Sequence, residues 1–219
     1  MTQLPTGNWD PLPPFPVAQG VAGSYAGTVR GALLVAGGAN FPDAPPWAGG
    51  AKVWHDTIHA LDRPSGTWRA AGRLPAPRGY GASWSTPRGM VLAGGSDPAT
   101  HHPETWLLTP GDDFAPQVRT IAPLPIPLAN VGFATDRHSL LVVVGQGTPS
   151  STTASALVFQ LRATPRWNWE EMPAIPGNTG RILPWVARLN GGWCAGGGAA
   201  LEAGPDGKSR RRPLRDAWW

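Results

Sequence analysis

Cysteine is almost absent from this sequence of 219 residues, since Cys194 is the only one. A single cysteine excludes an intrachain disulfide and a zinc site built from cysteines. Long apolar runs are also missing, because no stretch of about 18 apolar residues occurs that could span a membrane. The first residues lack the basic and apolar regions of a signal peptide. We therefore expect a cytoplasmic protein with no membrane partner.

Charged residues are scarce as well, at 15% of the chain, and part of the net charge of +4 comes from the cluster at residues 208–215. Such a cluster can bind phosphates. It contains no interleaved aromatic residues for base stacking, so we interpret it as a solvated loop and expect no nucleic-acid partner. No phosphate-binding loop, dinucleotide fingerprint or nucleophile elbow occurs, and we expect no cofactor. We interpret His101 and His102 as polar surface, and we expect no metal site.

Glycine and proline are abundant instead, with 29 and 26 residues, and they alternate with short apolar runs. This pattern indicates short strands joined by tight turns. Tryptophan is in excess too, with 12 residues against 2 tyrosines and 5 phenylalanines. A repeat that uses tryptophan would explain that excess.

Glycine pairs recur at a regular spacing along the chain. Their first residues are 57, 51 and 51 positions apart, at Gly37, Gly94, Gly145 and Gly196. A second landmark is an anchor residue followed six positions later by an apolar residue and then proline. It lies 28, 26, 27 and 27 residues before the glycine pairs, with its anchors at Trp9, Trp68, Val118 and Trp169. Two landmarks that keep one phase over four periods indicate a structural repeat.

Each period holds about four short strands. One begins after the proline, as in "GYGASWST", and a second ends at the glycine pair, as in "GMVLA". A third follows a variable loop ("ETWLLT"), and a fourth carries the anchor residue ("TWRAAGRLP"). Four antiparallel strands per period are the layout of a propeller blade. The sequence therefore predicts an all-β propeller with four blades, in which the anchor tryptophans pack between neighbouring blades.

A strand that ends in a glycine pair, followed some residues later by tryptophan, is typical of kelch repeats. More narrowly, the strings "AGGANFP" and "VWHD", with "PLPIPLANVGF" and "GRILPWVARLNGG" further on, resemble the cyclically permuted mutarotase branch of the N-acetylneuraminate epimerase family. The resemblance covers nearly the whole chain. It implies a kelch propeller that interconverts the anomers of N-acetylneuraminate, a sialic acid, and so a small sugar acid as the partner.

Members of that family have six blades, two more than the periods counted here. The chain begins on an outer-strand motif, residues 9–16, and ends on "RDAWW", which its spacing predicts to be a third strand. We expect one propeller domain over residues 1–219, either as a closed four-bladed ring or as an open arc left by truncation. The end inside a strand favours the arc, whose exposed blade faces would self-associate.

Anomer interconversion needs a base for the anomeric hydroxyl and an acid for the ring oxygen, and a guanidinium suits the carboxylate of a sugar acid. Arg78 and Arg181 precede their glycine pairs by similar distances, which predicts that both lie at one mouth of the central channel. Asn130 holds nearly the same position in the third repeat, and Asn40 follows the first glycine pair. These four are the candidate substrate-binding residues. Alternatively, the arginines bond neighbouring loops, and Asn40 caps its turn.

The catalytic acid and base stay unassigned, because the glutamate that the resemblance implies has no counterpart in this chain. Asp56, Glu104 and Asp216 recur in similar phase, which favours structural hydrogen bonds. Tyr80, two residues after Arg78, is interpreted as a packing residue. A second hypothesis, also open, is a kelch binding module without catalysis that binds a protein or a glycan.

Overall fold

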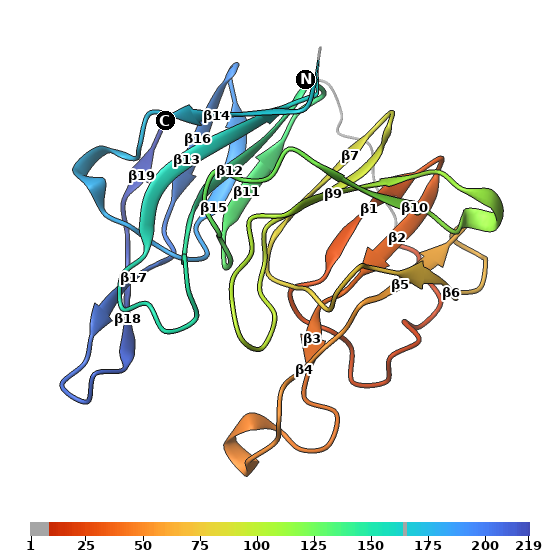
Figure 1. Cartoon of the computed structure of the whole chain (residues 1–219), viewed down its shortest axis with the longest axis horizontal. Coiled ribbons are helices and arrows are strands. Elements are labelled where there is room, and N and C mark those ends of the chain that lie inside the picture. The colour runs from red at the N-terminus through yellow and green to blue at the C-terminus, as the bar shows by residue number, and fades with distance from the viewer. Residues whose placement is uncertain (1–8, 164–165) are drawn as a thin grey trace.

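The structure, a computed structural model, describes residues 9–163 and 166–219, and these form strands, turns and three short 3-10 helices. The strands build four successive antiparallel sheets with two small hairpins beside them (Figure 1). The predicted all-β, four-bladed propeller arrangement is confirmed. Each sheet comes from one period of the glycine repeat.

Within each sheet the strands are ordered from the inside of the molecule to the outside, and chain order follows this sequence. The first sheet has β1 (Tyr25–Val29), β2 (Ala32–Ala36), β5 (Thr57–Leu61) and β6 (Arg69–Arg73). The second has β7 (Ala82–Thr86), β8 (Gly89–Ala93), β9 (Thr105–Thr109) and β10 (Gln117–Ile121). The third has β11 (Gly132–Thr135), β12 (Ser139–Gly145), β13 (Ser155–Arg162) and β14 (Asn168–Met172). The fourth has β15 (Trp185–Leu189), β16 (Gly192–Gly196) and β19 (Ala217–Trp218).

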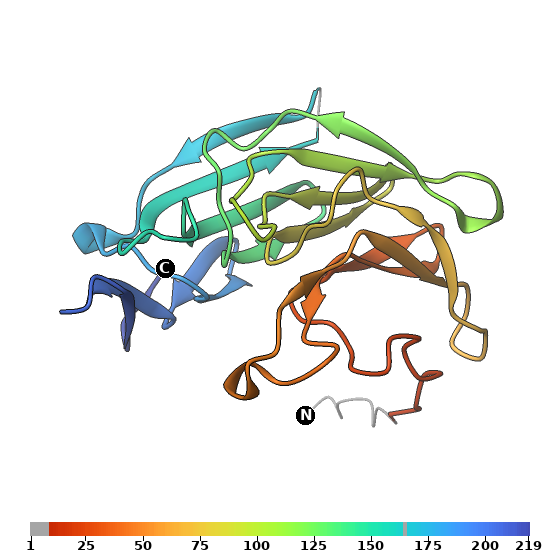
Figure 2. The same ribbon diagram turned by 60° about the horizontal axis from the view of Figure 1, so that its bottom comes forward.

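The sheets follow one another in chain order around an arc. The innermost strand of each sheet packs against the next one, β1 on β7, β7 on β11 and β11 on β15. The first and fourth sheets form the two ends of the arc (Figure 2). The four sheets therefore form an open arc and not a closed ring.

Burial explains why the second strands of the second and third sheets, β8 and β12, read as nearly unbroken apolar runs. All residues of β8, β9 and β12 are buried, because these central strands have a neighbouring sheet on each face. The outer strands β10 and β14 are mostly exposed. Three apolar clusters fill the spaces between successive sheets, and they include Tyr25 and Trp106 in the first, Trp84 and Phe159 in the second, and Val143 and Ile175 in the third.

Residues 9–16 correct one prediction, because they form no strand and Trp9 is fully exposed. The segment still occupies the place of an outer strand. The indole Nε1 of Trp68 donates to the Pro13 carbonyl (2.9 Å), and at the matching position Trp169 donates to the Ala122 carbonyl beyond β10 (2.9 Å). Phe15 packs edge-on against Trp68. Proline at four of the eight positions 9–16 prevents strand pairing of this segment but not this packing.

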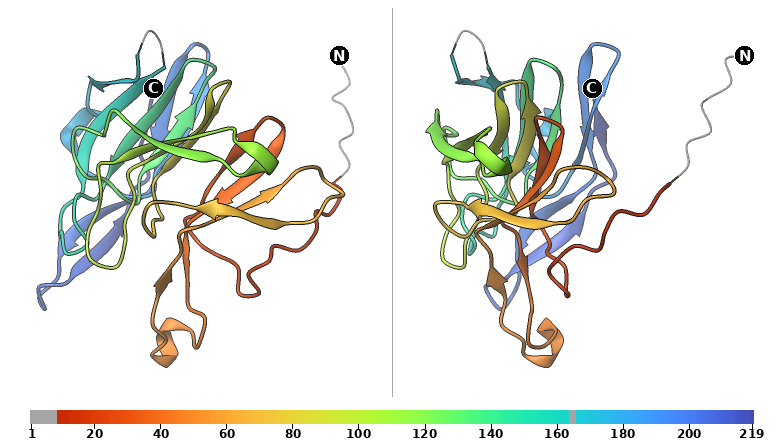
Figure 3. Two further views of the ribbon diagram at one scale, coloured as in Figure 1. Left: turned by 45° about the vertical axis from the view of Figure 1, so that its right-hand side comes forward. Right: turned by 90° about the vertical axis from the view of Figure 1, so that its right-hand side faces the viewer.

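Two hairpins were not predicted. One joins β3 (Ala39–Asn40) to β4 (Val53–Trp54) and carries the helix η1 (Pro46–Ala48) at its tip, which projects from the first sheet (Figure 3). The other joins β17 (Ala199–Ala203) to β18 (Ser209–Pro213). The basic cluster is thus exposed, as predicted, but most of it forms a strand rather than a loop. Both hairpins project from the same end of the molecule (Figure 1).

The "RDAWW" segment supplies the third strand of the fourth sheet, as predicted, since β19 pairs with β16. This sheet ends the arc with Trp185 and Leu189 half exposed and Trp219 more so. Self-association through such a face stays a prediction. No helix among the described residues is long and apolar enough to cross a membrane.

Candidate functional site

The innermost strands begin at the end of the molecule that carries the two hairpins, and a chain of backbone hydrogen bonds connects their starts. Tyr80 N donates to Gly23 O (2.7 Å), Asn130 N to Tyr80 O (2.9 Å) and Leu183 N to Asn130 O (2.8 Å). These four residues hold the same position in the four sheets, and each has a positive φ, from +53° to +66°. Residues other than glycine rarely adopt a positive φ, so the surrounding structure imposes this backbone conformation on Tyr80, Asn130 and Leu183. The bonds thus fix the side chains of Tyr80, Asn130 and Leu183 around the axis.

Arg78 and Arg181 lie close to this ring, but both guanidiniums are buried and bound to carboxylates of their own sheets. Arg181 is fully buried and donates two hydrogen bonds of 2.7 Å to Asp216. These bonds hold the pKa of the Asp216 carboxyl well below its usual value. Arg78 is 3% exposed, its guanidinium lies 3.3 Å from the Glu104 carboxylate, and its Cζ lies 4.7 Å from the centre of the Trp106 ring.

The two arginines contribute hydrogen bonds that hold the fold together. Neither lines the cavities described below. Their backbone carbonyls also join the sheets, since Gly38 N donates to Arg78 O (2.8 Å) and Gly145 N to Arg181 O (3.0 Å). A substrate-binding role for these arginines stays a prediction. The structural hydrogen bonds predicted for Glu104 and Asp216 are observed with these partners.

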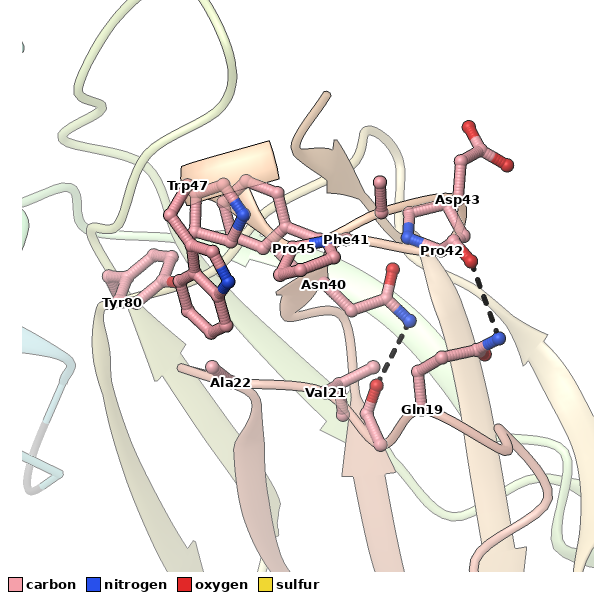
Figure 4. Close-up of a pocket in the computed structure, with 14 residues that line it drawn as sticks. Gln19, Val21, Ala22, Asn40, Phe41, Pro42, Asp43, Pro45, Trp47 and Tyr80 are labelled. Atoms are coloured by element: carbon pink, nitrogen blue, oxygen red, sulfur yellow. Dashed lines mark hydrogen bonds between the residues drawn. The ribbon is translucent and has the colours of Figure 1, made fainter. Parts of the chain in front are cut away.

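Asn40 borders a cavity of about 740 Å³ beside the β3–β4 hairpin, here called the loop cavity (Figure 4). Its amide Nδ2 donates to Gly20 O (3.0 Å), and its Oδ1 lies 2.9 Å from His55 Nε2. Both ends of the amide are thus held by neighbours. The rings of Trp47 and Tyr80 lie at one end of this cavity, and its lining is mostly apolar.

A second cavity, of about 410 Å³, lies on the axis, and we call it the axial cavity. Tyr80 borders both cavities. All four sheets or their loops contribute to the axial cavity, whose lining includes Lys52, Trp54, Tyr80, Ser96, Asp97, His101, Asn130, Gln146, Leu183 and Arg211. Most of these side chains are polar, so the axial cavity can hydrogen-bond a polar ligand, whereas the loop cavity can do so at few points.

Cations reach the axial cavity from both ends of the arc. The ammonium of Lys52, the residue directly before β4, lies 4.1 Å from the centre of the Tyr80 ring and 4.5 Å from that of Trp54. Arg211 comes from β18 of the fourth repeat. The one carboxylate in the lining, Asp97, already accepts hydrogen bonds from two backbone amides and faces His102 Nε2 at 2.7 Å. The cavity therefore suits an anion.

Neutral donors and acceptors complete the axial cavity. Asn130 Nδ2 lies 3.3 Å from Gln146 Oε1, and Gln146 Nε2 donates to the carbonyls of Pro149 and Ser151. His101 is 6% exposed, and its Nδ1 lies 2.8 Å from the Gln146 carbonyl oxygen. Burial lowers the pKa of His101 below its ordinary value. The imidazole is thus neutral near pH 7.

The structure brings one of the four predicted residues, Asn130, to the axial cavity, and places Asn40 at the loop cavity. The sequence analysis missed Lys52, Gln146 and Arg211 and did not treat His101 as a ligand contact. One signal was available for Gln146, since it stands where the other repeats have the second glycine of the pair. Among the described residues, no group of three or more histidine, cysteine or acidic side chains is placed to hold a metal ion.

Sequence comparisons relate the first part of the chain to one family. A family model for N-acetylneuraminate epimerase matches residues 7–105. A protein of Brucella suis named N-acetylneuraminate epimerase is 41% identical over 98 residues, which cover 39% of this chain and 25% of that protein. One of Yersinia pestis with the same name is 38% identical over 104 residues, covering 40% and 26%. The matched region thus spans about a quarter of these relatives.

Structural comparison extends the likeness to the whole fold. A solved structure titled "Structure of YjhT" superimposes with a TM-score of 0.78 over 99% of this chain and 72% of that chain, at 13% sequence identity. At this identity the match shows a common fold alone. The resemblance inferred from the sequence is confirmed for residues 7–105: this chain is a β-propeller whose first sheet and the inner half of the second are related to the N-acetylneuraminate epimerase family.

Proposed function

We propose that this chain binds N-acetylneuraminate in the axial cavity and accelerates the interconversion of its anomers. The observation that carries the proposal is that two cations, Lys52 and Arg211, both line a polar cavity in a fold related to N-acetylneuraminate epimerases. The axial cavity, of about 410 Å³, lies in the range of volumes that hold small-molecule ligands such as a nine-carbon sugar acid.

The lining matches the chemical groups of a sugar acid. A carboxylate beside Lys52 would form a charge-assisted hydrogen bond, stronger than one between neutral groups. The amides of Asn130 and Gln146 can both donate and accept, as hydroxyl and N-acetyl groups require. The rings of Tyr80 and Trp54 line the cavity beside the Lys52 ammonium. Ring opening also needs a group that takes up a proton.

Replacement of Lys52 by glutamine is expected to weaken the binding of N-acetylneuraminate about tenfold or more. The variant removes the charge but keeps most of the side chain, and a hydrogen bond to a charged group contributes about 1.5–3 kcal/mol. Titration of the sugar by calorimetry measures the affinity, and exchange spectroscopy by NMR measures the rate of anomer interconversion.

Lys208→Gln is the matched control, because Lys208 is exposed in the turn between β17 and β18 and does not line the axial cavity. It removes the same charge from the chain. Equal affinities for wild type and Lys52→Gln would refute the proposed carboxylate site. Sugar binding without faster anomer exchange would support the alternative of a binding module without catalysis.

A further inference from the structure

His101 is held rigidly at the edge of the axial cavity. Its backbone bridges to Ser96, the residue that follows the second glycine pair. Between them, Asp97 closes a short loop by accepting hydrogen bonds from the backbone amides of Ala99 and Thr100, both at 2.8 Å. Residues in such a closed loop have little freedom, so the imidazole is preorganised.

The contact of His101 with the third sheet fixes its tautomer. Its Nδ1 lies 2.8 Å from the backbone carbonyl oxygen of Gln146. A carbonyl oxygen only accepts hydrogen bonds, so Nδ1 carries the hydrogen. In the neutral ring the lone pair is then on Nε2. No side chain or backbone group of the described residues is hydrogen-bonded to this atom, and His101 lines the cavity.

The surroundings of His101 keep this lone pair available. The titratable and charged groups on the elements around it are Lys52 and Tyr80 from the first and second sheets, Asp97 and His102 from its own loop, and Arg211 from the fourth repeat. The third sheet contributes the amides of Asn130 and Gln146. Asp97 faces His102 at 2.7 Å and is hydrogen-bonded to its own loop. Burial disfavours the imidazolium and lowers the pKa of His101, so the base form predominates at neutral pH.

We propose that His101 is the general base of the anomer interconversion and that its Nε2 takes the proton of the anomeric hydroxyl. This inference rests on the proposed function. The O–H electron pair forms a carbonyl as the bond between the anomeric carbon and the ring oxygen breaks, and the ring oxygen takes a proton from water. Closure on the other face of the carbonyl reverses both transfers. The ring hydroxyl returns its proton to the hydroxide, and the imidazolium returns its proton to the new anomeric oxygen.

The test uses His101→Asn, because the asparagine amide can occupy the place of Nδ1 and keep the hydrogen bond to the Gln146 carbonyl while it removes Nε2. We expect the protein-dependent rate of anomer exchange to fall roughly 100-fold, the usual contribution of a general base. The affinity for N-acetylneuraminate should change less than threefold. The rate of the wild type should fall as the pH drops through the lowered pKa of His101, and this dependence should be lost in the variant.

His138→Asn is the control, since His138 is exposed in the turn before β12 and lies outside the axial cavity. It should leave both the rate and the affinity unchanged. A wild type that accelerates exchange while His101→Asn does so equally well would overturn the role of His101 and leave the proposed function standing. A wild type that does not accelerate exchange overturns both.

Discussion

Replacement of Asp216 by alanine is expected to lower the free energy of unfolding by about 3 kcal/mol. Arg181 is fully buried, and Asp216 accepts two of its hydrogen bonds at 2.7 Å. Without the carboxylate, the guanidinium keeps only its bond to the Gly197 carbonyl (3.2 Å). Loss of one partner of a buried pair costs about 3–5 kcal/mol, and the lower end applies because the Asp216 side chain is 33% exposed to water.

Urea unfolding measures this change, and hydrogen exchange at the amides of β16 locates it in the fourth sheet. Because the pKa of Asp216 is lowered in the folded state, the pair stabilises the fold above the unfolded pKa of about 4. The stability that it contributes is lost as the pH falls through the folded-state pKa, so wild type and variant should converge in acid.

Glu170→Ala is the matched control for this prediction. Arg162 and Glu170 form a pair at 3.0 Å in which both side chains are about half exposed, and exposed pairs contribute about 0–1 kcal/mol. A loss of stability in Asp216→Ala no larger than in this control would contradict the structural role assigned to Arg181.

Substitution of Gly37 by alanine is expected to destabilise the protein by about 3 kcal/mol. Gly37 has a φ of +63°, and a Cβ atom there would collide with the backbone carbonyl of Arg78, which receives the hydrogen bond from Gly38. The left-handed conformation costs alanine about 1–2 kcal/mol. Overpacking adds about 1–3 kcal/mol, since the contact lies between the first and second sheets. Urea unfolding again provides the measurement.

Gly31→Ala separates the two contributions. Gly31 also has a positive φ, of +83°, in the turn between β1 and β2, but a Cβ atom there would meet nothing within 4 Å. This variant should lose about 1–2 kcal/mol, the backbone cost alone. If Gly37→Ala lost no more than Gly31→Ala, the glycine pair would not be needed for the close approach of successive sheets.

The repeat was predictable from the sequence because the same physical constraint recurs in each period. A glycine is required where one sheet approaches the next, as Gly37 and Gly94 show, since a Cβ atom at either would meet a backbone carbonyl of the following sheet. The anchor tryptophans were predictable because their contact with the preceding repeat also recurs. Trp68 donates to the Pro13 carbonyl, and Trp169 donates to the Ala122 carbonyl at the equivalent position one repeat earlier. Trp9 has no preceding segment among the described residues, and it is exposed.

The site was less predictable because most of it does not repeat. Lys52 and Arg211 belong to hairpins inserted after the first and fourth glycine pairs, whose length and direction no periodic pattern encodes. Arg78 and Arg181 do repeat, and their shared phase predicted that both lie at one mouth of the channel. Their carboxylate partners lie 26 and 35 residues away along the chain, so the sequence alone did not reveal that both guanidiniums are already occupied.

The most direct test of the account is to map the binding of N-acetylneuraminate on the ¹H–¹⁵N spectrum of the wild-type chain. The account predicts saturable shift changes at the amides that surround the axial cavity, those of Ser96, His101, Asn130 and Gln146, and their absence at Glu170 on the outer strand β14. Unchanged spectra at millimolar sugar, or changes confined to the loop cavity around Trp47, would contradict it.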